Sequence, residues 1–202
     1  MIHDCFIFFN EFDLLEIRLN ELDPVVDRFV IVEATLTHQG KPKPLHYLEN
    51  KDRFAAWHHK IVHVVVDEYP GEPGGDAFFY EIHHRNGIIK GLKGCSPDDQ
   101  VMVSDVDEIP RPAMVREVAR STGVRIFRQT MYYYYLNCRN ITTFGGGEYA
   151  WNGTVMLRLG DINAPIQDYR HFSIRKRGHF HPKPLNRLYW RLTLGWEALR
   201  RG

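Results

Sequence analysis

From residue 100 to residue 110 the chain reads Gln-Val-Met-Val-Ser-Asp-Val-Asp-Glu-Ile-Pro, an apolar run that ends in three acidic residues and a proline. The run is typical of a buried β-strand that stops before Pro110. Residues two apart in an extended backbone face the same way, so Asp105 and Asp107 can present carboxylates to one ion while Val106 faces the core. Such ligands suit Mg²⁺ or Mn²⁺ shared with a phosphorylated substrate. The alternative is an acidic loop that caps a helix beginning near Pro110.

Two other kinds of site also use closely spaced aspartates. An EF-hand loop would need a third oxygen ligand followed by glycine, where this chain has Ile109 and Pro110, so that class is excluded. A phosphatase of the aspartyl-phosphate type would place Asp105 as nucleophile after an apolar strand. That alternative stays open.

Composition bounds the class of protein. The chain has 202 residues, 44% of them apolar, with a formal net charge of +1, which predicts one folded domain and no nucleic-acid partner. No apolar run approaches the roughly 20 residues that a membrane span requires. The three cysteines, Cys5, Cys95 and Cys138, are far apart in the sequence, which argues against a disulfide scaffold. We therefore expect a cytoplasmic protein.

Charge is concentrated at the end of the chain. Residues 170–202 hold nine Lys and Arg against the single acid Glu197. Apolar residues recur there at helical spacing between arginines, which predicts a basic amphipathic helix. This helix could lie peripherally on the anionic inner face of a membrane. Alternatively, it could pack on the acidic domain of the same chain. We accordingly divide the chain into a main folded domain over residues 1–169 and a basic segment over residues 170–202.

Strands and helices are predicted to alternate along the first half of the chain. Strands are expected over residues 2–9, 25–33, 61–66 and 100–104, and helices over residues 12–22, 50–58 and 77–92. This order is typical of an α/β fold with a single, mostly parallel, Rossmann-like sheet and helices on both faces. Ligands of such sheets bind beyond the carboxyl ends of the strands. The acidic motif follows one of those ends, which favours a functional site.

The pattern changes after Pro110. We expect a helix over residues 113–120, then strands over residues 125–128, 130–136 and 153–159. The four tyrosines of residues 132–135 alternate in direction if they form a strand, so two could line a cavity. Stacking on a sugar or base is one role for them, and plain packing is the other.

Several segments carry a resemblance to a known family. They are Asp-Cys-Phe at residues 4–6, Phe-Asn-Glu-Phe-Asp-Leu-Leu-Glu-Ile-Arg-Leu at 9–19, Val-Asp-Arg-Phe-Val-Ile-Val-Glu-Ala at 26–34 and Thr-His-Gln-Gly-Lys-Pro-Lys-Pro-Leu at 37–45. The acidic motif at 104–110, and Glu81 with Arg85 on the preceding helix, complete the match. In order and spacing the chain resembles glycosyltransferase family 17, the family of the bisecting β-1,4-mannosyl-glycoprotein N-acetylglucosaminyltransferase.

The resemblance implies a nucleotide-sugar transferase fold of the GT-A type, a divalent Mn²⁺ or Mg²⁺ ion and a UDP-sugar donor. Asp105 and Asp107 would hold the metal against the diphosphate. The residues expected to contact the donor are Asn10, Glu11, Glu33, Thr37, His38, Arg85 and Asp105. For those that follow the strands, the alternative role is a helix cap or a loop hydrogen bond. For Arg85 the alternative is an ion pair with Glu81, one helical turn earlier.

The resemblance also implies transfer with inversion, in which one carboxylate deprotonates the acceptor hydroxyl. Glu148, Asp161 and Asp168 are candidates for that base because they follow the metal motif. The sequence is thus interpreted as a metal-dependent glycosyltransferase that moves a sugar, with N-acetylglucosamine the first to consider, from a UDP-sugar to a glycan or lipid-linked acceptor. The family's C-terminal motif has no counterpart here, so a nucleotide-sugar-binding remnant without turnover remains an alternative.

Overall fold

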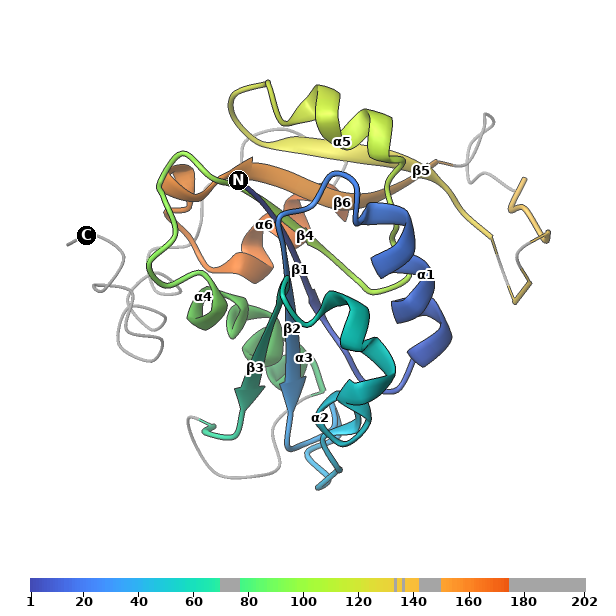
Figure 1. Cartoon of the computed structure of the whole chain (residues 1–202), viewed down its shortest axis with the longest axis vertical. Coiled ribbons are helices and arrows are strands. Elements are labelled where there is room, and N and C mark those ends of the chain that lie inside the picture. Colours follow the sequence, from blue (N-terminus) through green and yellow to red (C-terminus); the bar gives the residue numbers. More distant parts are fainter. Residues whose placement is uncertain (70–76, 133, 136, 142–149, 175–202) are drawn as a thin grey trace.

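A computed structural model of the chain describes residues 1–69, 77–132, 134–135, 137–141 and 150–174 (Figure 1). These residues form one six-stranded sheet with helices on both faces. Glu148, and the residues after 174 for which an amphipathic helix was predicted, lie outside the described residues.

The sheet has the strand order β3-β2-β1-β4-β6-β5. Its strands are β1 (Ile2–Ile7), β2 (Arg28–Ala34), β3 (Ile61–Val66), β4 (Gln100–Ser104), β5 (Arg125–Thr130) and β6 (Ala150–Arg158). The first four pair in parallel, whereas β6 runs antiparallel to both β4 and β5. The predicted α/β fold with a mostly parallel sheet is therefore confirmed, and β1 and β4 lie side by side with Phe6 opposite Ser104.

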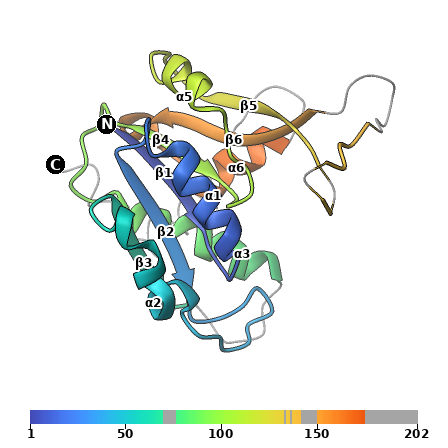
Figure 2. The same cartoon turned by 45° about the vertical axis from the view of Figure 1, so that its right-hand side comes forward.

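Helices lie on both faces of the sheet (Figure 2), and an apolar cluster lies on each face. The helices are α1 (Phe12–Leu22), α2 (His46–Asn50), the 3₁₀ helix η1 (Lys51–Trp57), α3 (Ala77–Asn86), α4 (Ile88–Gly91), α5 (Pro112–Val118), the 3₁₀ helix η2 (Leu159–Asp161) and α6 (Ile166–Ile174). One cluster contains residues of α1, α2, η1 and α5, and the other contains residues of α4 and α6. Both faces are thus buried, as the continuous apolar strands β2 and β4 require.

The spacing of apolar residues explains how these helices dock. In α1, Leu15, Leu19 and Leu22 recur at helical spacing and are fully buried against the sheet. At Gly91 in α4, an added Cβ would lie 2.4 Å from Cγ1 of Val30, so only glycine permits this close approach of helix to strand. These contacts fix the helices that carry polar side chains to the carboxyl ends of the strands.

The structure differs from the predicted elements in two places. The helix predicted over residues 77–92 is two helices, α3 and α4, because the chain turns at Gly87 between them. The strand predicted over residues 130–136 is wrong: β5 ends at Thr130, and Tyr132 makes only an isolated bridge to Arg139. Tyr134 and Tyr135 are exposed on the excursion seen at the right of Figure 1. Alternation of side chains along a strand therefore does not apply to these two tyrosines.

The end of the described chain bears on the division into two segments. Helix α6 crosses the division drawn between residues 169 and 170, and Arg170 is buried within the domain. In the described part of the chain, no helix has both the length and the apolar character to span a bilayer.

Candidate donor-binding site at the acidic motif

The backbone of the acidic motif rests on a buried arginine from α1. Arg18 donates through Nη1 to the carbonyl oxygens of Asp105, Val106 and Glu108, at 3.0 to 3.2 Å. Its remaining donors bind both carboxylate oxygens of Asp4 at 2.6 and 2.8 Å, and neither side chain is exposed. Three carbonyls that turn toward one guanidinium define the shape of the loop after β4. Arg18 therefore holds the loop through its backbone, while Asp107 is exposed and Val106 and Glu108 are buried.

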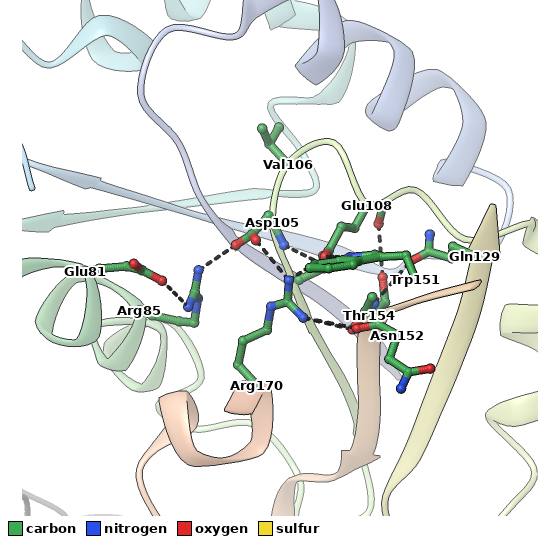
Figure 3. Close-up of polar contacts among 12 residues, drawn as sticks. Glu81, Arg85, Asp105, Val106, Glu108, Gln129, Trp151, Asn152, Thr154 and Arg170 are labelled. Atoms are coloured by element: carbon green, nitrogen blue, oxygen red, sulfur yellow. Dashed lines mark hydrogen bonds and ion pairs between the residues drawn. The ribbon is translucent and has the colours of Figure 1, made fainter. Parts of the chain in front are cut away.

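Two further arginines clamp the first aspartate of the motif (Figure 3). Arg85 from α3 binds Oδ1 of Asp105 at 2.5 Å, and Arg170 from α6 binds Oδ2 at 3.0 Å. Burial alone would raise the pKa of Asp105, but the two guanidiniums outweigh it and hold that pKa below its ordinary value. Asp105 is thus ionised, with both oxygens paired.

Glu108 belongs to the same network. Its Oε1 accepts from Arg170 and from the indole Nε1 of Trp151, and its Oε2 accepts from the backbone N–H of Asp105 at 3.0 Å. The side chain is buried, and loss of water raises its pKa despite the charge of Arg170. We name the set of Arg85, Asp105, Glu108 and Arg170 the open cluster. Glu108 closes its inner side and is not placed to bind an ion.

Asp107 differs from its neighbours because it is exposed and no described residue forms an ion pair with it. Partial loss of water and then the negative charge of Asp105 raise its pKa. A cation beside Asp107 would relieve both effects. The residues therefore fit Mg²⁺ or Mn²⁺ held directly by Asp107 and completed by phosphate oxygens and water, the coordination that Mg²⁺ prefers. Asp105 could join only after releasing an arginine.

A cavity of about 470 Å³ adjoins the open cluster at the carboxyl ends of β1 and β2. Its walls include Phe8, Phe9, Val32, Leu36, Thr37, His38, Lys43 and His84. Burial lowers the pKa of His84 to about 3, and partial loss of water lowers that of His38 at the cavity mouth. His84 and Arg85 are consecutive on α3, so this one helix joins the cavity to the open cluster. A mostly apolar cavity of this size with a few polar groups is typical of a small-molecule site.

Comparisons with known proteins were made against families, curated proteins and solved structures. The sequence model of glycosyltransferase family 17 matches residues 1–142. The chain belongs to glycosyltransferase family 17. Relatives include the β-1,4-mannosyl-glycoprotein 4-β-N-acetylglucosaminyltransferases of Homo sapiens, Rattus norvegicus and Mus musculus, each 36% identical over 110 residues. The aligned region is 50% of this chain and 20% of each relative, so the chain spans about a fifth of their length.

A solved structure with a similar outline is the 2-C-methyl-D-erythritol 4-phosphate cytidylyltransferase of Francisella tularensis. The match covers 99% of this chain and 86% of the cytidylyltransferase chain, with a TM-score of 0.43 and 14% identity.

The structure brings together only some of the residues that the sequence predicted for the donor. Glu11, Thr37 and His38 line the cavity, and Arg85 lies in the open cluster with Asp105. Arg85 also pairs with Glu81 at 2.9 Å, which is the alternative role given for it, and its contact with the donor stays a prediction. Asn10 is exposed at the end of β1.

Glu33 is buried away from the cavity. Its carboxylate accepts from the backbone N–H groups of Tyr47 and Leu48 and from Nε2 of His63, at 2.7 to 3.1 Å. It therefore holds the first turn of α2, and this placement favours the helix-cap alternative over donor contact. Glu11 and Thr37 likewise accept backbone N–H bonds within their own loops, while they face the cavity.

The two described candidates for the general base, Asp161 and Asp168, lie in different surroundings. Asp161 follows β6, whose end at Arg158 pairs with Gln100 at the start of β4, so Asp161 lies at the opposite end of the sheet from the acidic motif. It is engaged there by Arg158, and its prediction as the base for this site is wrong. Asp168 lies on α6 close in sequence to Arg170, with its Oδ2 buried and lacking a described partner. Burial raises the pKa of Asp168, as a general base requires.

One further group of metal-ligand type occurs among the described residues, formed by His3, Cys95 and Asp99. It lies at the amino ends of the strands, remote from the acidic motif. Asp99 already accepts from Nε2 of His3 at 3.0 Å and from the backbone N–H of Ser96. These bonds account for the group as a tie between β1 and the segment before β4.

Sequence reasoning missed three side chains that shape the site, namely Arg18, Trp151 and Arg170. Arg18 lay in a segment quoted for the family resemblance but was given no role. Trp151 and Arg170 follow the region that matches the family model, and Arg170 was assigned to the basic segment. A buried arginine carries no periodic signature, so only its place in the fold shows which carboxylates it meets.

Proposed function

We propose that this family 17 chain is a metal-dependent glycosyltransferase that moves a sugar from a UDP-sugar to a glycan or lipid-linked acceptor, with inversion. N-acetylglucosamine is the first sugar to test, because the mammalian relatives are named for its transfer. The observation that carries the proposal is the exposed Asp107 next to the clamped Asp105, at the carboxyl end of β4.

The cavity and the open cluster divide the donor between them. The apolar walls and the neutral imidazole of His84 suit a nucleoside, whereas Arg85 and Arg170 supply two guanidiniums suited to phosphate. The charges of Arg85 and Asp105 act on His38 in the cavity wall, so a nucleoside in the cavity would lie close enough to direct its diphosphate toward the arginines. The arrangement therefore matches a nucleoside diphosphate whose base points away from the chemistry.

The metal is assigned to Asp107. When bound, it would act as a Lewis acid toward the leaving diphosphate. The protein's own contribution is to hold positive guanidiniums around the position where that negative charge develops, with Asp107 as the carboxylate that would hold the metal. Arg18 supports the loop that carries Asp107, so this arrangement exists before the donor binds.

We assign the general base for the acceptor hydroxyl to Asp168, whose buried Oδ2 lacks a described partner and whose pKa is raised by burial. Its carboxyl is half-buried on α6, the helix that also carries Arg170. We assign the acceptor to a mannose-containing glycan or a lipid-linked saccharide. Peripheral membrane contact through the basic segment, on the cytoplasmic side, belongs to the same proposal and can be tested by sedimentation with anionic vesicles.

The test is a transfer assay. The purified chain is incubated with Mn²⁺, UDP-N-acetylglucosamine and a synthetic mannosyl glycopeptide, with UDP-glucose and UDP-galactose as alternative donors. The proposal predicts a glycopeptide heavier by one sugar, with inverted anomeric configuration by NMR, and no product from Asp107→Ala or Asp168→Asn.

The two alternatives give other results. Binding of UDP without product from any donor would support a nucleotide-sugar-binding protein without turnover. Hydrolysis of a phosphate monoester that is lost in Asp105→Asn would support the phosphatase. Both Asp105 oxygens pair with arginines in this structure, so a phosphatase would need one of those bonds broken before Asp105 could act as nucleophile.

A further inference from the structure

The charged groups of the open cluster are paired with one another before any ligand arrives. Two buried guanidiniums, Arg85 and Arg170, face two carboxylates, Asp105 and Glu108, and each Asp105 oxygen binds one arginine. The arginine side chains are 3% and 2% exposed, whereas the side chain of Asp105 is 37% exposed. Solvent, and any ligand, therefore reaches this network at Asp105.

Both arginines are held by other partners as well. Arg85 also donates to Glu81 and to Oε1 of Gln167. Arg170 also donates to Glu108 and to the carbonyl oxygens of Asn152 and Gly153. Each guanidinium would therefore stay in place if its single bond to Asp105 were broken. The link between the arginines and Asp105 is the replaceable part of the network.

We propose that Asp105 exchanges partners when the donor binds: its carboxylate passes from Arg85 and Arg170 to the metal ion, and the two guanidiniums pass to the diphosphate. Arg170 thereby becomes a donor-binding residue and a positioning residue for the metal, a role the basic segment was not expected to hold. The inference rests on the proposed function, since it names the ligands that take the two halves of the network.

The charge pairs of the network favour both exchanges occurring together. A metal that took Asp105 alone would leave each buried guanidinium with one carboxylate where it had two, and a diphosphate that took the arginines alone would leave the partly buried Asp105 without a cation. Loss of an ionic partner in a partly buried network is unfavourable. The metal and the nucleotide must then bind with positive coupling, and each raises the affinity of the other by the same factor. The arginines therefore compete with the metal for Asp105, and they contribute to nucleotide binding by pairing with the diphosphate.

Two binding measurements test this exchange, because the affinities for Mn²⁺ and for UDP should change in opposite directions. Mn²⁺ binding to the nucleotide-free protein is measured from the electron paramagnetic resonance signal of free Mn²⁺. UDP binding at saturating Mn²⁺ is measured by calorimetry. For Arg170→Gln and for Arg85→Gln we expect Mn²⁺ to bind about 3- to 10-fold more tightly, because Asp105 is released, and UDP to bind about 10-fold more weakly or worse.

Arg53→Gln is the matched control. Arg53 also joins two carboxylates, Asp13 and Glu16, each at 2.8 Å, but on the surface beside α1. Both affinities should match the wild type. A purely structural role for Arg85 and Arg170 would lower both affinities together, and that result, or an unchanged Mn²⁺ affinity, would overturn the exchange.

The lysine variants carry the test if the glutamine variants do not fold, which circular dichroism reports. Arg170→Lys and Arg85→Lys keep the charge but lose the fork geometry, and we expect smaller changes of the same opposite signs. Equal or weaker Mn²⁺ binding in these folded variants would again contradict the exchange. Failure of wild-type UDP binding would instead contradict the proposed function, while the Mn²⁺ measurement alone would still report whether arginines mask Asp105.

Discussion

Two sets of arginines meet the same acidic loop from different sides, and they differ in what they hold. Arg18 and Asp4, the sealed cluster, are fully buried, and Arg18 binds backbone carbonyls of the loop. In the open cluster, Arg85 and Arg170 bind the side-chain carboxylates of Asp105 and Glu108. This cluster reaches solvent at Asp105. A guanidinium that holds backbone fixes a shape, whereas one that holds a partly exposed carboxylate can change partner.

This difference separates stability from binding within a single loop. Loss of the sealed cluster should strongly destabilise the fold, and changes in the open cluster should mainly alter affinity for charged ligands.

The sealed cluster gives the largest effect. Arg18→Met removes the cation from buried Asp4 and leaves three loop carbonyls without their donor. We expect a loss of about 3–5 kcal/mol in the free energy of unfolding, measured by urea denaturation. Adding Asp4→Asn to that variant should restore part of the loss, because the uncompensated charge is gone. A loss below about 1 kcal/mol would show that the cluster is not sealed.

The pH dependence of the free energy of unfolding tests the protonation state of His84, a residue of the cavity wall. This histidine is 4% exposed, and its pKa of about 3 lies below the ordinary 6.5, so the folded protein holds it neutral. Its contribution to stability is present above pH 6.5 and is lost as the pH falls, since the unfolded chain takes up the proton first. We expect a loss of about 2 kcal/mol between pH 6.5 and pH 5.

The histidine prediction has a matched pair of variants. His84→Gln should show a shallower decline in unfolding free energy over that pH range, while His59→Gln, which changes an exposed histidine, should decline as the wild type does. Equal slopes in all three proteins would mean that His84 is not held neutral.

Trp151 tests whether Glu108 is a fixed member of the open cluster. Trp151→Phe keeps an aromatic ring near Arg170 but removes the indole N–H that binds Oε1 of Glu108. A lost hydrogen bond to a buried carboxylate should cost about 1.5 kcal/mol of unfolding free energy. UDP affinity should change less than in Arg170→Gln. A larger loss of affinity than in Arg170→Gln would place the indole at the ligand.

The smallest effect is expected from an exposed arginine. Arg53 joins Asp13 and Glu16 as Arg170 joins Asp105 and Glu108, but in water the attraction is screened. Arg53→Gln should leave the urea midpoint unchanged within error. A measurable shift would mean that exposure does not separate the arginine clusters as described.

Sequence reasoning located the loop but not its supports. The strand before Asp105, the parallel order of the first four strands and the place of Asp107 beyond β4 all follow from local apolar patterns, which the sheet preserves. Glu81 and Arg85 were found together because a helix places residues four apart side by side.

The missing parts depend on distant segments. Arg170 is 65 residues from Asp105 in sequence, and Arg18 is 87 residues from it, so neither contact leaves a local signal. Glu33 misled because a residue at the end of a strand can face the ligand side or cap the next helix, and only its burial decides between them. Asp161 misled because β6 runs antiparallel, which moves its following residues to the other end of the sheet.

The central claim, that the acidic loop binds a metal and a nucleotide together through Asp107, is tested most directly by calorimetry of UDP binding. It is measured with Mn²⁺ and with a chelator for the wild type, for Asp107→Ala and for Asp98→Ala, an exposed aspartate at the opposite end of the sheet. We predict binding that requires Mn²⁺, weakens about tenfold or more in Asp107→Ala and is unchanged in Asp98→Ala. UDP binding that ignores both the chelator and the loss of Asp107, or no binding at all, would contradict the account.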